Sequence, residues 1–413
     1  VDVAIVGGGM VGASFALALA GSGLSTILVE SVAPGSRAQP SFDERTTALG
    51  NASRRIFEGL GIWDRIAPEA AAIRTIHVSD AGRFGFARLR ADEHGIDAFG
   101  YVVPNRVIGA ALWQALEHCG DVRLRVPARP GDLQIAPADV RFTVQDDSGS
   151  VEQVRARLVV AADGAHSIVR DAAAIDALIE EYEQVAIVAN VGADRAHDGT
   201  AYERFTPSGP LAVLPLRDGS YAAIWACEPG WAKQVLALDD ARFLLELQQR
   251  FGWRAGRFVR AGKRASYPLR LTRAARPVGL RTVLIGNAAQ ALHPVAGQGF
   301  NLGLRDAAML AETLVTPHSA TGAKVDPGSA ALLDQFARWR SGDRDGVVRF
   351  TDGLVRLFGS TRPGVGLLRN LGLLLFDLTP AAKGALARVS AGFAGPTPRL
   401  ARGLPIRQPG GRS

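Results

Sequence analysis

The sequence predicts an α/β fold in which a doubly wound, Rossmann-like nucleotide-binding domain carries an inserted, mostly antiparallel β-sheet and ends in a helical segment. Three observations predict it: an N-terminal strand, glycine turn and helix; a middle region of short strands separated by turn residues; and helical apolar spacing in the last third of the chain. The 413 residues, 47% of them hydrophobic, suffice for one large α/β unit with an inserted sheet or for two domains.

The N-terminal unit has the pattern of a dinucleotide-binding βαβ unit. A buried strand leads into Gly7, Gly9 and Gly12, which give the spacing Gly-x-Gly-x-x-Gly. The first glycine permits the turn, the second lets the backbone approach a pyrophosphate, and the third lets the helix pack on the strand. Glu30 follows a second apolar strand and is placed to accept hydrogen bonds from a ribose. These four residues therefore predict a dinucleotide site.

The next segments alternate between the two predicted sheets. Short alternating pieces broken by glycines between residues 73 and 100 predict strands that leave the nucleotide-binding domain. A helix is expected after Asn105, and a buried strand ends at Asp163 and Gly164. Four strands between residues 182 and 227 then predict the antiparallel sheet. Its candidate pocket-wall residues, which fit plain sheet core equally well, are Phe205, Leu214, Pro215 and Trp225.

These changes of pattern give the predicted domain boundaries. The nucleotide-binding domain is expected at residues 1–72, 101–180 and 271–355, the inserted substrate domain at 73–100 and 181–270, and the C-terminal helical segment and tail at 356–413.

A second glycine-rich stretch follows the inserted sheet. The strand Val283–Ile285 is followed by a loop at residues 294–299 and by helical apolar spacing. Such a turn directs free backbone N–H groups at whatever lies above it, and Gly297 and Gly299 would let a flat ring approach the main chain. An ordinary tight connection between strand and helix is the alternative. The polar face of the helix is expected to consist of Arg305, Asp306 and Glu312.

This stretch resembles the second flavin motif of the FAD-dependent aromatic-ring hydroxylases. The residues that carry the resemblance are Asn287, Ala288, Pro294, Gly297, Gln298, Gly299, Asn301, Gly303 and Asp306. Within that family the wording is most similar to the hydroxylases of ubiquinone biosynthesis, in particular the 2-polyprenyl-6-methoxyphenol hydroxylase group. The family's commoner form has Asp and His where this sequence has Asn287 and Gln290. Asn can still hydrogen-bond the ribityl chain of a flavin, but without charge.

The resemblance implies FAD as the cofactor and a set of residues around it. Besides the N-terminal glycines and Glu30, it implies flavin contacts by Arg45, Asn105, Asp163, Gly164, Asn287, Gly297, Gly299 and Asn301. Two of these have a plain structural alternative: Arg45 also fits a solvated loop residue, and Asp163 also fits an Asp at a strand-end turn. Relatives often carry Arg or Gln at the position of Asn105.

The resemblance also implies the reaction: reduced FAD and molecular oxygen form a flavin hydroperoxide that hydroxylates the ring of a polyprenylated phenol. The candidate catalytic residues are His293, Pro294, Gln298 and Gly299. Backbone N–H groups near Gln298 and Gly299 suit the negative charge on reduced flavin. His293 either polarises the phenol or stabilises the loop. The alternatives are a flavin-dependent dehydrogenase or prenyl reductase, and a non-catalytic flavoprotein of a biosynthetic assembly.

Composition bounds the partners. A second Gly-x-Gly-x-x-Gly unit is absent from the sequence, so NAD(P)H or another electron donor is expected to visit the same cavity. The formal charge of +7 suits an anionic cofactor or an anionic membrane surface. No zinc-ligand spacing or long basic run points to a metal or to nucleic acid. A homo-oligomer or a biosynthetic complex is compatible with these features.

The sequence predicts a cytoplasmic protein peripherally associated with the inner face of the membrane. Two cysteines fit a reducing compartment, and no apolar run is long enough to span a bilayer. Residues 363–394 hold a dense apolar block flanked by basic residues. This block either packs on the core or binds lipid as an interfacial helix.

Overall fold

A mainly parallel sheet forms the nucleotide-binding part of the computed structural model, which describes residues 1–36, 45–292, 297–321, 325–359 and 397–406. The strand order is β18-β19-β12-β1-β2-β8, with only β18 antiparallel to its neighbour. In chain order the strands are β1 (Val3–Val6), β2 (Thr26–Val29), β8 (Val122–Arg125), β12 (Leu158–Ala161), β18 (Val278–Gly279) and β19 (Thr282–Leu284).

Both faces of this sheet are covered, which explains why its strands are apolar without alternation. Val3 and Ile5 of β1 pack in one cluster with three helices, whereas Ala4 and Val6 pack in another with a small antiparallel sheet. The helices are α1 (Met10–Leu19), α4 (Asn105–Cys119) and α8 (Gln298–Thr321). The small sheet consists of β9 (Ala128–Ile135), β10 (Val140–Asp146) and β11 (Val151–Ala156).

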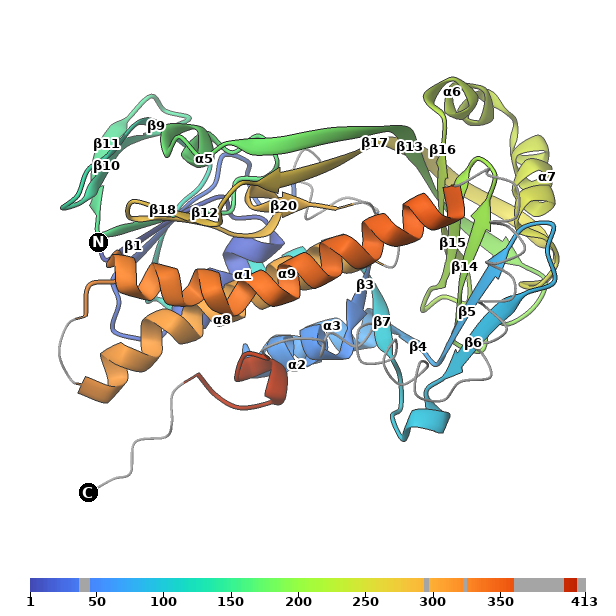
Figure 1. Ribbon diagram of the computed structural model, residues 1–413, viewed down its shortest axis with the longest axis horizontal. Helices are drawn as coiled ribbons and strands as arrows, with labels where there is room; N and C mark the ends of the chain where they lie inside the picture. Colours follow the sequence, from blue (N-terminus) through green and yellow to red (C-terminus); the bar gives the residue numbers. More distant parts are fainter. Residues whose placement is uncertain (37–44, 293–296, 322–324, 360–396, 407–413) are drawn as a thin grey trace.

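An eight-stranded sheet forms the second part and lies at the other end of the molecule (Figure 1). It is antiparallel except for the parallel pair β14 and β5. Its order is β20 (Gln290–Ala291), β17 (Phe258–Ala274), β13 (Ala177–Ala193), β16 (Tyr221–Cys227), β15 (Gly209–Pro215), β14 (Thr200–Thr206), β5 (Thr75–Asp80) and β6 (Phe86–Arg90). The predicted fold class is therefore confirmed.

The two faces of the large sheet have different neighbours. Helices α6 (Pro229–Ala237) and α7 (Asp240–Phe251) cover the outer face and bury Trp225. Leu214, also predicted for the pocket wall, faces the opposite side, as does Ala201. That side packs against a three-stranded sheet of β3 (Thr46–Gly50), β7 (Gly100–Pro104) and β4 (Ala71–Ile73). The inner face of the large sheet therefore faces the nucleotide-binding part.

Two strands of 17 residues, β13 and β17, connect the parts. They extend across residues 181 and 270, so domain boundaries at single residues stay a prediction. The remaining helices are α2 (Asn51–Gly59), α3 (Trp63–Ile66), α5 (Ile168–Ala172) and α9 (Ala330–Gly359). Among the residues described, no helix is long and apolar enough to cross a membrane.

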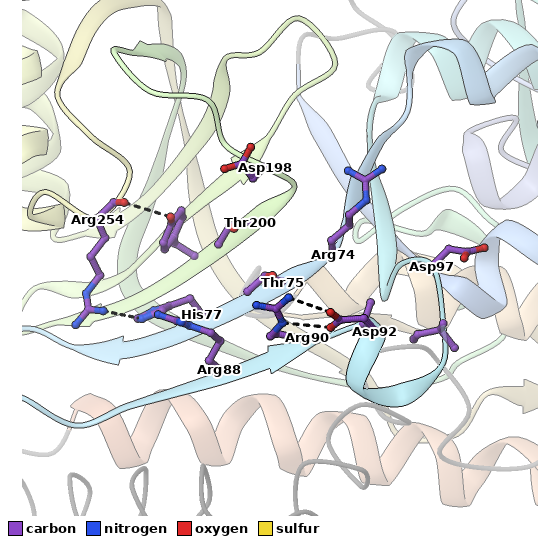
Figure 2. Close-up of a pocket in the computed structure, with 13 residues that line it drawn as sticks. Arg74, Thr75, His77, Arg88, Arg90, Asp92, Asp97, Asp198, Thr200 and Arg254 are labelled. Carbon is purple, nitrogen blue, oxygen red and sulfur yellow. Dashed lines mark hydrogen bonds and ion pairs between the residues drawn. The ribbon is translucent and has the colours of Figure 1, made fainter.

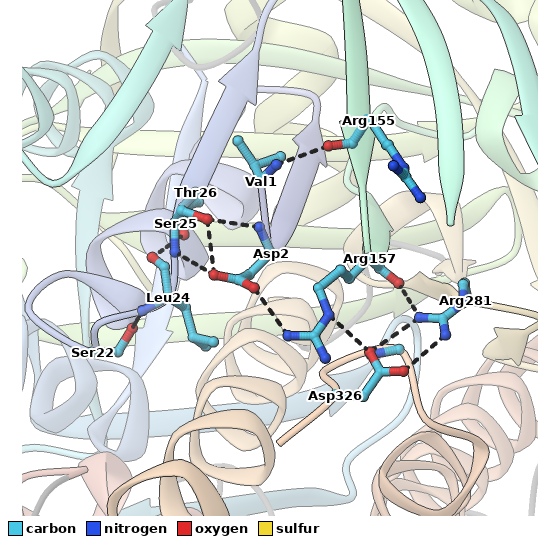
Figure 3. A network of polar contacts seen from close by, with 11 residues as sticks. Val1, Asp2, Ser22, Leu24, Ser25, Thr26, Arg155, Arg157, Arg281 and Asp326 are labelled. Carbon is cyan, nitrogen blue, oxygen red and sulfur yellow. Dashed lines mark hydrogen bonds and ion pairs between the residues drawn. The ribbon is translucent and has the colours of Figure 1, made fainter. Parts of the chain in front are cut away.

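The amino ends of the parallel strands are joined by a polar network (Figure 3). Arg157 Nη1 donates to Asp2 at 3.2 Å and its Nε lies 3.4 Å from Asp326. Arg281 Nη2 donates to the same Asp326 at 2.8 Å. The network thus fixes the edge of the sheet opposite to the glycine turns, where its role is structural.

Candidate functional site

The predicted site residues gather at the carboxyl edge of the parallel sheet. Gly7 follows β1, Glu30 follows β2, Asp163 follows β12 and Asn287 lies three residues beyond β19. Because these strands are neighbours in the order β19-β12-β1-β2, all four residues lie at one edge. Ligands of open α/β sheets bind outside this edge.

The first glycine turn leaves no room for side chains. Gly7 has φ of +102°, and a Cβ there would overlap the carbonyl oxygen of Ala162. A Cβ on Gly12 would overlap the carbonyl oxygen of Gly7. The sequence therefore needs glycine at both positions to bring the start of α1 against the strand ends.

The start of α1 carries backbone N–H donors that have no acceptor within the helix itself. Gly9 is its N-cap residue, without a side-chain hydrogen bond, and the first turn carries no acidic side chain. Four backbone N–H groups at a helix start lack partners within the helix, and the helix dipole favours an anion there. This end of α1 therefore suits a pyrophosphate.

Glu30 is held in place beside this turn. Its Oε2 accepts from the Gly8 N–H at 2.6 Å and its Oε1 accepts from the Val32 N–H at 2.8 Å. The carboxylate is 8% exposed. Oε1 also accepts a long hydrogen bond from Ser31 Oγ at 3.4 Å, whereas Oε2 keeps a further lone pair for a ribose hydroxyl.

Asp163 carries an acceptor that lacks a partner. Its Oδ1 is buried and receives no hydrogen bond from the described part of the chain, while Oδ2 accepts weakly from the Val169 N–H at 3.4 Å. Burial raises the pKa of this carboxyl above its ordinary value, against the opposing effect of local hydrogen bonds. Such an orphaned oxygen is expected where a ligand hydroxyl donates. The neighbouring Gly164 has φ of +87°.

Close packing of glycines brings a second helix start to the same place. A Cβ on Gly303 of α8 would lie 3.0 Å from Gly286 Cα and 3.0 Å from the Val11 side chain of α1. The starts of α1 and α8 therefore lie side by side. Gly297, with φ of +59°, ends the loop that precedes α8.

Asn301 connects Gly297, at the end of this loop, to β3 of the three-stranded sheet and to α2. Its Oδ1 accepts from the Gly50 N–H at 2.8 Å and from Ser53 Oγ at 2.6 Å. Its Nδ2 donates to the carbonyls of Ala48 and Gly297 at 2.8 and 2.7 Å. With four protein partners and 2% exposure, this side chain acts as a clamp on the loop. A flavin contact by Asn301 stays a prediction.

Arg45 and Asn105 lie next to each other at the junction of the two parts. The Arg45 guanidinium lies 4.6 Å from the centre of the Tyr267 ring on β17. The Asn105 N–H donates to the Arg45 carbonyl at 2.8 Å, and Thr47 Oγ1 donates to Asn105 Oδ1 at 2.7 Å. Arg45 therefore spans from β3 to the inner face of the large sheet.

The remaining predicted residues divide between described and undescribed positions. His293 and Pro294 lie outside the described residues. Gln298 and Gly299 form the first turn of α8, and among the described residues no atom lies within 4 Å of a Cβ built on Gly299, apart from its chain neighbours and the helix's own backbone. Asn287 is exposed between buried Gly286 and Ala288. Asn287 and the first turn of α8 thus border open space.

The polar face predicted for α8 proved wrong for two of its three residues. Arg305 and Asp306 are 2% and 3% exposed because α9 covers them. Asp306 accepts from Arg340 Nε and from Gln290 Nε2, both at 2.6 Å. Arg305 and Arg340 both donate to Asp343 of α9, at 2.9 and 2.5 Å. The partners in these ion pairs belong to α9, and the spacing of residues within α8 does not reveal that α9 packs on this face.

Burial alone would raise the pKa of Asp343, but the charges and hydrogen bonds of Arg305 and Arg340 outweigh it and lower the pKa. Through Gln290 the network also reaches β20 of the large sheet. We therefore assign these ion pairs to holding α8 against α9 and β20.

Sequence reasoning missed Glu203 of β14. Its neighbour Tyr202 packs on Phe251 of α7, with ring centres 5.4 Å apart, so strand alternation turns Glu203 toward the inner face with Ala201. Its cross-strand partners are Val78 and Ala212. Burial raises the pKa of Glu203 to about 7. The available signal was an acid between Ala201 and Phe205 at alternate positions of a predicted strand.

These observations fit a flavin dinucleotide. The start of α1 suits the pyrophosphate, Glu30 the ribose, and the orphaned Asp163 oxygen a ribityl hydroxyl. The open space beside Gly299 admits a flat ring. Within the same described ranges, no group of three or more His, Cys, Asp or Glu side chains is placed to hold a metal ion.

Comparisons with known proteins agree with FAD as the cofactor. The family model described as FAD binding domain matches residues 1–350. Ubiquinone hydroxylase UbiL of Rhodospirillum rubrum is 38% identical over 409 residues, covering 98% of this chain and 93% of that protein. The 3-demethoxyubiquinol 3-hydroxylase of Escherichia coli is 32% identical, covering 95% and 98%. The structure of p-nitrophenol 4-monooxygenase PnpA from Pseudomonas putida has a TM-score of 0.77 at 20% identity, covering 95% and 98%, and is similar in fold.

Proposed function

The chain belongs to the FAD binding domain family and is an FAD-dependent monooxygenase, and on that premise we propose that it hydroxylates the aromatic ring of a polyprenylated phenol in ubiquinone biosynthesis. The observation that carries the proposal is the near full-length similarity to ubiquinone hydroxylase UbiL. Because the similarity covers both sheets, it includes the part that would line the substrate cavity.

FAD, when bound, supplies the electron transfer and the activation of molecular oxygen. The residues proposed to hold it are Gly7, Gly9, Glu30, Asp163 and Asn287, at the carboxyl edge of the parallel sheet. The N–H groups in the first turn of α8 would stabilise negative charge on the reduced ring system. We retain Gln298 and Gly299 in this role. His293 and Pro294 stay proposed members of the same loop.

The inner face of the large sheet supports the proposed substrate class. Its side chains from β13, β15 and β16 are mostly apolar, including Ala186, Leu214 and Ile224. Such a face can hold a phenol ring with a hydrocarbon tail and exclude water from the reacting atoms. Arg45, at the junction of the two parts, is proposed to place the flavin against this face.

Glu203 is proposed to accept the phenolic proton. A phenol becomes more electron-rich when it loses its proton, and hydroxylation places an electrophilic oxygen on the ring. A base with a pKa of about 7 is half deprotonated at neutral pH, which suits general base catalysis. On the described inner face, Glu203 provides such a group among mostly apolar side chains.

Two further proposals concern the electron donor and the place of the enzyme in the cell. A monooxygenase of this family requires oxygen and a reduced donor, and we propose NAD(P)H. We also propose peripheral contact with the cytoplasmic face of the membrane through residues 363–394, which lie outside the described residues. Replacing Leu373 and Leu374 by Asp would then weaken turnover of a long-chain phenol while sparing a short-chain analogue. Equal loss with both substrates would contradict lipid contact.

Oxygen uptake tests the proposed function directly. The FAD-loaded protein is given a reduced donor and a prenylated phenol, and the products are identified by mass spectrometry. Substrate-stimulated oxygen uptake with one added oxygen atom in the phenol is expected. Phenol turnover without oxygen incorporation would contradict hydroxylation and favour a dehydrogenase.

A further inference from the structure

A cavity of about 620 Å³ lies at the β5–β6 end of the large sheet, apart from the flavin site described above (Figure 2). Its lining includes His77 and Tyr202, paired side by side on neighbouring strands. Since Tyr202 packs against Phe251 of α7, these side chains occupy the outer face of the sheet. The cavity is therefore separated from the inner face, and from the glycine turns, by the sheet itself.

One end of the cavity is cationic. Arg254 Nη1 donates to His77 Nε2 at 2.8 Å, so this ring nitrogen carries no proton. The guanidinium groups of Arg254 and Arg88 lie 5.3 and 5.6 Å from the centre of the Phe86 ring. Burial, followed by the charges of Arg254, Arg88 and Arg204, lowers the pKa of His77 to about 4. The histidine is thus neutral at physiological pH, and the two exposed arginines converge beside it.

The opposite end of the cavity holds three acids, Asp92, Asp97 and Asp198, and two arginines, Arg74 and Arg90, so acids are in excess there. Arg90 is paired with Asp92 at 2.9 Å, which cancels both charges. Asp97 and Asp198 also line the cavity and are exposed. A complementary ligand therefore has an anionic group at the Arg88 and Arg254 end and hydroxyl groups at the other end. A phosphate carrying a polyol has this distribution of groups.

Two exposed aromatic side chains, here called the aromatic rim, neighbour the residues of the cationic end along the chain. Phe84 and Trp253 are 69% and 68% exposed, more than any other large apolar side chain of the described residues. Phe84 precedes Phe86 by two positions, and Trp253 directly precedes Arg254. Exposed aromatic side chains next to arginines are typical of surfaces that rest at the headgroup level of a bilayer.

We propose that this cavity binds the phosphate of a lipid headgroup and that the β5–β6 end of the sheet contacts an anionic membrane surface. A soluble phosphate would use the arginines but would leave the aromatic rim exposed to water. A lipid uses both, because its headgroup enters the cavity while Phe84 and Trp253 enter the interface. The proposal requires neither FAD nor turnover, so it can fail while the proposed function holds.

The first experiment follows the His77 ring by NMR in the full-length protein, with His77→Gln identifying its signal. Adding sn-glycerol 3-phosphate is expected to raise the pKa of His77, because the bound anion favours the protonated ring. Arg88→Gln and Arg254→Gln should each abolish this ligand-induced change. Arg129→Gln, which removes an exposed arginine of β9 in the other part, is the matched control and should leave the change intact. An unaltered His77 pKa would overturn the proposal.

The second experiment measures co-sedimentation with phosphatidylglycerol vesicles, with phosphatidylcholine vesicles for comparison. Each of the two arginine variants is expected to bind phosphatidylglycerol vesicles about fivefold less well, equivalent to roughly 1 kcal/mol per basic residue. Phe84→Ser and Trp253→Ser should weaken vesicle binding but leave the glycerol 3-phosphate effect on His77 unchanged. Soluble glycerol 3-phosphate should compete with the vesicles.

Three results would overturn the proposal. Equal weakening by Arg129→Gln would mean attraction by overall charge. Glycerol 3-phosphate binding without vesicle binding would assign the cavity to a soluble phosphate. Vesicle binding that is lost on changing Leu373 and Leu374 but retained in the Arg88 and Arg254 variants would place the membrane contact in residues 363–394.

Discussion

Replacing Glu203 by Gln is expected to slow the reaction and, at alkaline pH, to stabilise the protein. Burial raises the pKa of this carboxyl from an ordinary value of 4.5 to about 7. Because the pKa is higher in the folded than in the unfolded protein, the carboxyl is protonated in both states below pH 4.5 and does not lower the free energy of unfolding there. The ionised carboxyl destabilises the fold increasingly between pH 4.5 and 7, and fully above pH 7. A shift of about 2.5 pH units corresponds to ~3 kcal/mol.

Urea unfolding at two pH values measures this effect. At pH 8 the Glu203→Gln variant should have a free energy of unfolding up to ~3 kcal/mol higher than the unmodified protein, and near pH 4.5 the difference should vanish. Glu117→Gln, an exposed acid of α4, is the control and should show no difference at either pH. A variant that is no more stable at pH 8 would refute the burial of an ionised carboxylate at this position.

The same variant separates catalysis from stability. Loss of a general base lowers the rate by ~10²–10⁴-fold. The unmodified protein should show kcat/KM rising with pH up to an inflection near 7, and Glu203→Gln should lose that inflection. A variant with normal rate and an unchanged pH profile would assign the phenolic proton to another group. Lower activity with higher stability would be the signature of a functional buried acid.

Three further predictions concern the flavin site and its support. Gly9→Glu should abolish FAD uptake, measured by flavin absorbance after purification, because it adds charge and bulk beside the start of α1; normal uptake would contradict the pyrophosphate assignment. Gly299→Val should leave the melting temperature unchanged, since no neighbouring atom in the described part of the chain lies within 4 Å of its Cβ, but should reduce turnover on the order of 10²-fold. Normal turnover would place the ring elsewhere. Asp343→Asn should lower the free energy of unfolding by ~3–5 kcal/mol, because Arg305 and Arg340 lose a buried partner. Since the pKa of Asp343 is lowered, its stabilisation is present above about pH 4 and is lost as the pH falls through the folded pKa, which acid unfolding checks.

The sequence predicted the features that depend on local rules. The glycine turn at Gly7, the strand-end acids Glu30 and Asp163, and the alternating strands of the large sheet follow from turn chemistry and from the period of apolar residues. The proposed site residues lie at one edge because the carboxyl ends of parallel strands meet there. Which of these residues become neighbours depends on the order of the strands in the sheet.

The features that were missed depend on contacts between distant segments. Glu203 becomes a half-buried acid only through its pairing with the strands that hold Val78 and Ala212. Arg305 and Asp306 look like a solvated helix face until α9 covers them. Asn301 reads as a ligand-binding amide, yet its partners include Gly50 and Ser53, some 250 residues away in the chain. The apolar periodicity of a single segment does not show which distant segments will contact it.

The strand order also dictates when a newly made chain can take up its cofactor. β1 emerges first from the ribosome, but its neighbour β12 ends at Ala161 and the outer neighbour β19 begins at Thr282. The second helix start, at Gln298, comes later still. At the site proposed here, FAD can therefore bind completely only after most of the polypeptide has been synthesised, because until then β12, β19 and α8 are missing beside the N-terminal glycine turn. A fragment truncated before residue 282 would consequently lack a complete flavin site, however well its first βαβ unit folds.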